Sequence, residues 1–251
     1  ELRTPLNSSL ILTKLLAENK EGNLTGEQVK FAQTIFSAGN DLLALINDIL
    51  DLSKIEAGKV EVEPEPVHIA RTVDALVKSL QPVAEQKGLE LTSAIEPGTP
   101  ERMETDPQRL SQILRNLLSN ALKFTEAGAV SLRVFAATGG AVSFAVRDTG
   151  IGIPAEQHDL IFEAFRQADG STHRKYGGTG LGLSISRDLA RLLGGEITVA
   201  STRGEGSLFT LTLPLVHASR AEVVRTSAPP PRREEARGRA AAPPARNHPV
   251  A

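Results

Sequence analysis

The sequence predicts an N-terminal α-helical hairpin, paired with a second copy in a dimeric four-helix bundle, followed by an α+β domain built as a two-layer sandwich. A long apolar repeat of helical period over residues 26–57 supports the hairpin. From residue 59 onward, strand and helix patterns are mixed without the strict strand–helix–strand order of a doubly wound sheet, which favours the sandwich. Residues 217–251 are rich in Pro, Ala and Arg and lack apolar periodicity, so they are predicted to be a disordered tail.

The helical part is predicted to contain a short helix, Leu6–Ala17, and a long helix over residues 26–57. In the long helix, apolar residues alternate spacings of four and three, as in a heptad repeat: Phe31, Ile35, Ala38, Leu42, Leu45, Ile49 and Leu52. Leu43, Ile46 and Leu50 make this stripe wider than a two-stranded coiled coil needs. A homodimeric four-helix bundle would cover it.

The elements of the sandwich are predicted from changes of period and from turn signals. In chain order they are a strand at 59–67, a helix at 69–86, strands at 89–95, 129–136 and 141–147, and strands at 196–201 and 207–215. Asp106-Pro107 opens a further helix that runs to about Lys123, because Asp is a good N-cap and Pro suits the first helical position. Another helix is predicted at 183–193, after a glycine-rich irregular segment.

These elements divide the chain into four parts. They are 1–58 for the helical hairpin, 59–67 for a linker and first strand, 68–216 for the sandwich domain and 217–251 for the tail.

The composition excludes several classes of protein. The chain has no Cys, which excludes a disulfide scaffold, a Cys-ligated zinc site and thiol catalysis. A net charge of −2 gives no overall attraction to nucleic acid or to an anionic membrane. No apolar run reaches the roughly 18 residues of a membrane-spanning helix, so no membrane contact is expected within this sequence.

Asn116, Asn120 and Lys123 are spaced to lie on one face of a helix. Two amide oxygens and an ammonium group at one surface suit a hard cation together with phosphate oxygens. A solvated helix face is the alternative interpretation, although Asn is a poor helix former and its repetition favours a function.

Asp148 is followed directly by Thr149, Gly150, Ile151 and Gly152, at the end of a predicted strand. A carboxylate there can accept a hydrogen bond from an exocyclic amine, while glycine lets the backbone approach closely. Residues 150–155 also match the dinucleotide-binding pattern GxGxxA. We reject that interpretation because the surrounding strand–helix–strand unit is missing and Pro154 removes an amide.

Residues 177–183, with the sequence GGTGLGL, open a predicted helix. Backbone N–H groups at a helix N-terminus attract phosphate. The pattern GxxxxGK[ST] of a P-loop is absent from the sequence. The alternative interpretation is a plain flexible turn. It is less favoured because the segment is dense in glycine and lies next to Lys175 and Tyr176.

In their order along the chain, these motifs resemble the catalytic core of the sensor histidine kinases. The resemblance covers residues 1 to about 215. The matched motifs are Glu1–Asn7 (the segment directly after the phosphoacceptor histidine), 116–123 (N box), 148–152 (first glycine box), 162–165 (F box), 167–178 (nucleotide lid of hybrid-type members) and 178–182 (second glycine box).

The resemblance implies that ATP and Mg²⁺ bind the sandwich domain. Asn120 would hold Mg²⁺ with Asn116 beside it, Lys123 would contact phosphate, and Asp148 would accept from the adenine amino group. The remaining residues implied to bind ATP are Gly150, Gly152, Ile153, Phe165, Lys175, Tyr176, Gly178, Thr179, Gly180, Leu181, Gly182 and Ser207.

The phosphoacceptor histidine of the family would immediately precede Glu1. Glu1 would then assist proton removal from the imidazole, and Thr4 would orient water when the partner is dephosphorylated. None of the five His residues of the chain lies in that sequence context.

The implied function is a protein-histidine kinase of two-component signalling that passes the γ-phosphoryl group of ATP to His and then to Asp of a response-regulator receiver domain. The implied location is cytoplasmic, including as the cytoplasmic part of a membrane-bound sensor. Two alternatives stay open: an ATP-binding module that acts mainly as a phosphatase or scaffold for its partner, and a gyrase-like ATPase.

Overall fold

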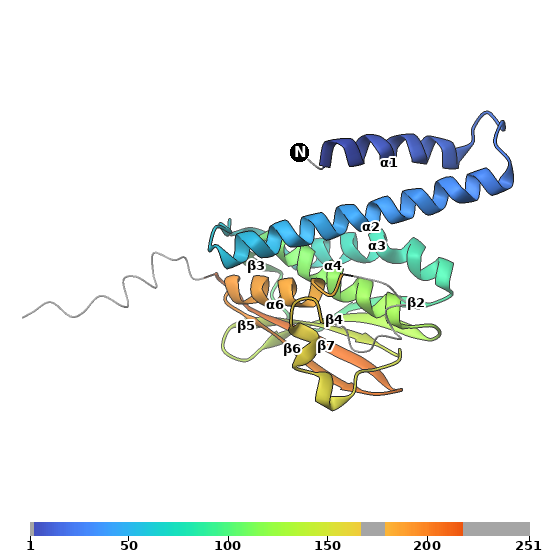
Figure 1. Cartoon of the computed structure of the whole chain (residues 1–251). Coiled ribbons are helices and arrows are strands. Elements are labelled where there is room, and N and C mark those ends of the chain that lie inside the picture. Colours follow the sequence, from blue (N-terminus) through green and yellow to red (C-terminus); the bar gives the residue numbers. More distant parts are fainter. Residues whose placement is uncertain (1–2, 167–178, 218–251) are drawn as a thin grey trace, which may run out of the picture. The chain divides into compact units, whose positions relative to one another are not determined.

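The computed structural model describes residues 3–166 and 179–217. The predicted tail lies outside the described residues except for His217, whose N–H donates to the Glu104 carbonyl oxygen at 3.1 Å, so the sandwich domain extends one residue further than predicted. Within the described residues, a helical hairpin precedes a domain in which three helices cover a β-sheet (Figure 1). This arrangement confirms the predicted order of a hairpin followed by a two-layer α+β sandwich.

The hairpin consists of α1 (Arg3–Glu18) and α2 (Gly26–Glu56), which pack against each other. Thr25 caps α2 in a reciprocal arrangement, because its hydroxyl accepts from the Gln28 N–H at 3.3 Å and the Gln28 side chain accepts from the Thr25 N–H at 2.8 Å. Leu10 of α1 is buried where it meets α2. Both predicted helices are confirmed, and α1 begins three residues earlier than expected.

The connection from the hairpin to the sandwich differs from the prediction. Residues 59–64 form no strand, and β1 covers only Glu65–His68. It pairs antiparallel with β3 (Arg102–Thr105), a strand that the sequence analysis missed. Both strands have four residues, too few to show a period of two, and they are stabilised by the pairing of Val67 with Met103, which are both buried.

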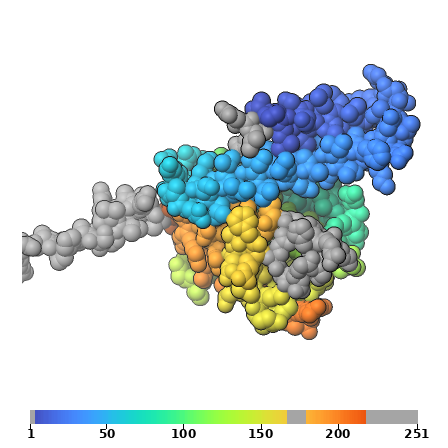
Figure 2. Space-filling view, viewed as in Figure 1, coloured from blue at the N-terminus to red at the C-terminus, as the bar shows by residue number. Residues whose placement is uncertain are grey.

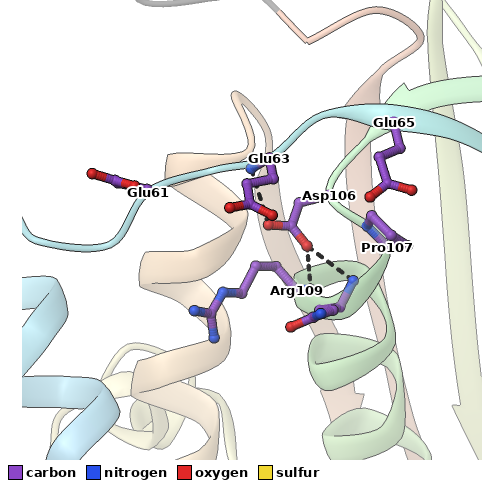
Figure 3. Close-up of a pocket in the computed structure, with 7 residues that line it drawn as sticks. Glu61, Glu63, Glu65, Asp106, Pro107 and Arg109 are labelled. Atoms are coloured by element: carbon purple, nitrogen blue, oxygen red, sulfur yellow. Dashed lines mark hydrogen bonds between the residues drawn. The ribbon is translucent and has the colours of Figure 1, made fainter.

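Asp106 ties this connection to the start of α4 (Pro107–Phe124) (Figure 3). Its Oδ1 accepts from the N–H groups of Gln108 at 2.9 Å and Arg109 at 3.0 Å, and its Oδ2 accepts from the Glu63 N–H at 3.3 Å. The predicted N-cap is thus confirmed. The pocket in Figure 3 is lined by carboxylates of Glu61, Glu63 and Glu65 and by the residues of this cap. The hydrogen bonds drawn there hold the linker to the start of α4.

The main sheet has five strands in the order β2-β4-β5-β7-β6. The strands are β2 (Glu90–Ile95), β4 (Ala129–Ala137), β5 (Ala141–Asp148), β6 (Glu196–Thr202) and β7 (Gly206–Pro214). β2 pairs parallel with β4, and the other pairs are antiparallel. The strands predicted at 129–136, 141–147, 196–201 and 207–215 are confirmed, and β4–β5 and β6–β7 each form an antiparallel hairpin.

The helices α3 (Ile69–Lys87), α4 and α6 (Gly182–Leu192) lie on one face of this sheet (Figure 1). Two short 3₁₀ turns, η1 (Ala155–Gln157) and η2 (Leu160–Phe162), follow β5. Apolar side chains between the layers are buried, among them Phe144 of β5, Leu114 of α4 and Leu189 of α6. This core fixes the C-terminal ends of α4 and β5 and the start of α6.

Candidate functional site

Three segments that are far apart in the sequence meet at one place: the end of α4, the end of β5 and the start of α6. The Ile151 N–H, just after β5, donates to the carbonyl oxygen of Phe124 at the end of α4, at 3.3 Å. Asn116 of α4 donates to the Ser186 hydroxyl of α6 at 2.8 Å. The structure therefore brings together the amide, carboxylate and glycine motifs that the sequence predicted to act together.

Asp148 ends β5 and is buried. Its Oδ1 accepts from the Gly150 N–H at 2.8 Å and from the Ser207 N–H at 3.2 Å. Burial raises the pKa of the Asp148 carboxyl, and the hydrogen bonds from Gly150 and Ser207 partly offset that rise. A buried carboxyl of this kind is a specific acceptor for a ligand N–H group.

The loop after Asp148 is pressed against the β6–β7 turn. Gly152 has a φ of +63°, and a Cβ there would collide with the carbonyl oxygen of Thr202. The Gly204 N–H donates to the Ile151 carbonyl oxygen at 2.7 Å, and the Ile153 N–H donates to the Ser201 hydroxyl at 2.8 Å. Gly150, Gly152 and Ile153 thus form a fixed wall beside Asp148.

The two asparagines of α4 form a chain of hydrogen bonds that sets their orientation. Asn120 Nδ2 donates to Asn116 Oδ1 at 3.4 Å, and Asn116 Nδ2 donates to Ser186 Oγ at 2.8 Å. Because the Asn120 amide nitrogen is directed to Asn116, its Oδ1 is the atom that can ligate a cation. Both side chains are half-buried.

This donor set fits Mg²⁺ bound together with a nucleotide. Among residues 3–166 and 179–217, no group of three or more acidic or histidine side chains could hold a metal ion. Mg²⁺ usually takes one or two protein oxygens and completes its octahedron with substrate phosphates and water. An oriented amide oxygen from Asn120 meets that need.

Lys123 lies one turn after Asn120, with its Nζ 4.9 Å from the centre of the Phe124 ring. Burial lowers the pKa of the Lys123 ammonium, the Asp41 carboxylate on α2 raises it and Lys87 lowers it. The predicted phosphate ligand thus lies beside the asparagines, in a partly desolvated position where a charge acts strongly.

The start of α6 supplies backbone donors. The N–H groups in the first turn of a helix have no partner within it, and the helix dipole favours an anion there. Leu181 is buried, and its N–H donates to the Thr179 hydroxyl at 3.2 Å. That hydroxyl donates in turn to Asp48 Oδ2 of α2 at 3.0 Å, and burial raises the pKa of Asp48. Thr179, Gly180, Leu181 and Gly182 therefore lie at the N-terminus of α6, as predicted, and the Leu181 N–H and the Thr179 hydroxyl have partners within the protein.

The two Phe residues of the predicted F box have different surroundings. Phe162 is buried, and the Arg187 guanidinium lies 5.1 Å from its ring centre and donates to its carbonyl oxygen at 3.1 Å. Phe165 is 64 % exposed, with a φ of +63°, and its N–H donates to the Gly180 carbonyl oxygen at 3.1 Å. Phe165 therefore contacts the segment that precedes α6 through its backbone.

The other predicted site residues lie elsewhere. Thr4 is exposed in the first turn of α1, which packs on α2 and is not one of the elements that build this site. Glu1, Lys175, Tyr176 and Gly178 lie outside the described residues.

Sequence reasoning missed three residues that hold the site together: Ser186, Ser201 and Asp48. They lie outside the matched motifs, and each acts through one hydroxyl or carboxylate contact with a distant segment. A single Ser or Asp in a helix or strand carries no sequence signal of that kind.

Comparison with known proteins identifies the family of each part of the chain. Residues 105–217 match the family model described as histidine kinase-, DNA gyrase B- and HSP90-like ATPase. Residues 1–58 match the model of the His kinase A (phospho-acceptor) domain. The sandwich is thus a gyrase-like ATPase domain, and the helical hairpin is a phosphoacceptor domain.

The chain belongs to the sensor histidine kinase family and is a catalytic core of the hybrid type. It is 44% identical over 213 residues to the signal transduction histidine-protein kinase BarA of Escherichia coli (strain K12), a match that covers 83% of this chain and 23% of BarA. It is also 44% identical over 216 residues to the circadian input-output histidine kinase CikA of Synechococcus elongatus, covering 85% of this chain and 28% of CikA. The chain therefore spans about a quarter of the length of these relatives.

Solved structures give the same result. Full-length ShkA in complex with AMPPNP is 37% identical, with a TM-score of 0.72 over 87% of this chain and 45% of ShkA. The histidine kinase ThkA in complex with the response regulator protein TrrA is 20% identical, with a TM-score of 0.60 over 85% of this chain and 60% of ThkA, and it supports the fold alone. In the part of the chain that the structure describes, no helix is long and apolar enough to cross a membrane.

Proposed function

We propose that this chain binds ATP·Mg²⁺ between α4, β5 and α6 and transfers the γ-phosphoryl group to a histidine, and from there to an aspartate of a response-regulator receiver domain. One observation carries the proposal: a buried carboxylate, an oriented amide oxygen and a helix N-terminus converge on one site. The carboxylate suits the amino group of a base, and the amide oxygen suits a cation bound to phosphate. The helix N-terminus suits the phosphates themselves. Phosphoryl transfer depends mainly on positioning and charge neutralisation, which such a site supplies.

In this proposal, Asp148 accepts from the adenine amino group, and the wall formed by Gly150, Gly152 and Ile153 contacts the base. Ser207 supports Asp148 through its backbone N–H. Mg²⁺, held by Asn120 with Asn116 beside it, would neutralise charge on the phosphates. The residues proposed to contact the phosphates or to cover the nucleotide are Lys123, Phe165, Lys175, Tyr176, Gly178, Thr179, Gly180, Leu181 and Gly182.

The proposed acceptor is a histidine immediately before Glu1, on the phosphoacceptor hairpin that residues 1–58 match. The imidazole nitrogen forms the new bond to phosphorus while the bond to the ADP oxygen breaks. Glu1 takes up the imidazole proton, and Thr4 orients water for dephosphorylation of the partner. The match of residues 1–58 favours this kinase over the gyrase-like ATPase.

The proposed partners are a second copy of the chain and a receiver domain. Exposed apolar side chains line α1 and α2, including Leu12 at 63% and Ile35 at 59%. The face shown in Figure 2 displays α1 exposed along its length. A hairpin with this much uncovered apolar surface is completed by a second hairpin in a four-helix bundle.

The first test is nucleotide binding. In the presence of Mg²⁺, Asp148→Ala and Asn120→Ala are each expected to weaken ATP binding at least about tenfold, because each loses one direct contact. Isothermal titration calorimetry measures this, with Asn40→Ala as the matched control, since Asn40 is an exposed asparagine of α2. Unchanged affinity in both site variants would refute the assignment.

The second test is phosphorylation. A chain extended at its N-terminus by one helical turn that ends in His is expected to form an acid-labile, alkali-stable phosphoprotein with radioactive ATP. The same extension ending in Ala, and the chain that begins at Glu1, are expected to remain unlabelled. Labelling of either control would show that the acceptor lies elsewhere.

A further inference from the structure

We propose that Ser201 is a positioning residue for recognition of the nucleotide base: it is not itself assigned to contact the nucleotide, and it acts through Ile153 and Ser207, which are. The inference rests on the proposed function, because it concerns the site in which Asp148 accepts from adenine. Ser201 lies near the end of β6, outside the motifs that the sequence analysis identified.

The Ser201 hydroxyl is the meeting point of three backbone segments. It accepts from the Ile153 N–H at 2.8 Å, which fixes the loop after Asp148. It donates to the Gly206 carbonyl oxygen at 2.7 Å, where β7 begins. Ser207 Oγ lies 3.0 Å from it, within hydrogen-bond distance. One hydroxyl therefore sets the spacing between the loop, β6 and β7.

This spacing controls the environment of Asp148. Ser207, the cross-strand partner of Ser201, donates its N–H to Asp148 Oδ1 at 3.2 Å, and the Gly150 N–H donates to the same oxygen at 2.8 Å. The carboxylate is thus held from two sides, by the loop and by β7. Ser201 is bonded to both of these sides.

The loop has little room to find another position. The Gly204 N–H donates to the Ile151 carbonyl oxygen at 2.7 Å, and Gly152 is in close contact with the Thr202 backbone. Without the Ser201 hydroxyl, the Ile153 N–H and the Gly206 carbonyl would both lack their partner. For these two groups to find new hydrogen-bond partners, the loop after Asp148 and the β6–β7 turn must shift relative to each other.

The consequence is a loss of selectivity for the base. Phosphate contacts come from α4 and α6, which the Ser201 hydroxyl does not contact. A shift of the loop therefore affects adenine recognition and leaves the phosphate contacts in place. Discrimination between nucleotides that differ only in the base is the property that Ser201 is expected to control.

The test compares ADP with GDP in Mg²⁺ buffer, by competition against a fluorescent ADP analogue. Ser201→Ala is expected to weaken ADP binding about tenfold and GDP binding less than about twofold, so the preference for ADP narrows. Ser201→Thr keeps the hydroxyl and suits a strand, so it is expected to restore the preference. Thr198→Ala, at an exposed position of the same strand, is the control.

Equal weakening of ADP and GDP by Ser201→Ala, or no change for ADP, would overturn the inference. If the unsubstituted chain fails to bind ADP, the proposed function itself is refuted. If it binds ADP but Ser201→Ala leaves the preference for ADP over GDP unchanged, only the inference about Ser201 is refuted. Should Ser201→Ala not fold, Ser201→Cys keeps the volume while its sulfur is a much weaker hydrogen-bond partner, and the same narrowing is expected.

Discussion

At the scale of single residues, Asp148 shows how stability and recognition oppose each other. Burial raises the pKa of its carboxyl, so the ionised form that accepts from a ligand amine is disfavoured in the folded protein. At a pH between the ordinary and the raised pKa, the folded chain holds a proton that the unfolded chain has released. The free energy of unfolding therefore falls as the pH rises through that window.

Asp148→Asn separates these two effects. The amide oxygen can still accept from Gly150 and Ser207, so stability at neutral pH is expected to equal or exceed that of the unsubstituted chain. The contribution of the Asp148 carboxyl to the pH dependence of the free energy of unfolding is expected to disappear in this variant, as urea titrations at several pH values would show. Nucleotide affinity, which needs the ionised acceptor, is expected to fall at least about tenfold. Retained affinity would contradict the role of Asp148.

The pH dependence of binding has the opposite sign. ADP affinity of the unsubstituted chain is expected to rise as the pH increases through the raised pKa of Asp148, because in the proposed site the ionised carboxylate is the stronger acceptor for the adenine amino group. Calorimetry at a series of pH values above 3.8, the ordinary pKa of an Asp carboxyl, measures this change. The Asp148→Asn variant is the control, and its ADP affinity is expected to lack this rise with pH.

At the scale of secondary-structure elements, the contact between α4 and α6 connects the face of α4 proposed to bind Mg²⁺ to the helix N-terminus proposed to bind phosphate. Gly182, the first residue of α6, lies so close to Asn116 that a Cβ there would collide with the Asn116 amide. Asn116 in turn orients Asn120 and bonds to Ser186. The glycine is therefore required by a side chain on the neighbouring helix.

Gly182→Ala is expected to displace the Asn116 side chain and to weaken Mg²⁺-dependent ATP binding about tenfold. Alanine is the better helix former, so the free energy of unfolding is expected to change by less than about 1 kcal/mol. Gly26→Ala is a matched control, because Gly26 is the first residue of α2 and a Cβ there meets nothing within 4 Å. Equal loss of affinity in the control would refute the α4–α6 argument.

At the scale of the whole molecule, α2 uses different parts of its apolar stripe for different contacts. Leu45, Leu52 and Ile55 pack against the core of the sandwich domain. Phe31 and Ile35 are more than half exposed. The heptad stripe is therefore shared between the sandwich and the surface proposed to meet a second copy.

The exposed part of the stripe predicts a dimer. Light scattering at tens of micromolar is expected to give twice the mass of the chain, and Phe31→Glu together with Ile35→Glu is expected to give the monomer mass, because two charges would be buried in the bundle. Lys30→Glu changes the charge at a neighbouring exposed position and is expected to stay dimeric. A monomeric unsubstituted chain would contradict the bundle.

The sequence by itself determined the helices and the strands of the two main hairpins, and it predicted the candidate site residues. Periodicity in α2, the Asp106 cap and the glycines around Asp148 are local signals, and each is readable within a few residues. The order of the motifs along the chain also predicted which segments form the candidate site.

Only the tertiary structure decided the supports of that site. The pairing of β1 with β3, the bond of Ser186 to Asn116 and the three contacts of Ser201 join segments that are far apart along the chain or that meet only across a turn. The covering of Leu45 and Leu52 of the α2 stripe by the sandwich also depends on distant residues. The physical reason is that a hydrogen bond or a buried contact depends on distance in space, whereas periodicity and capping depend on distance along the chain.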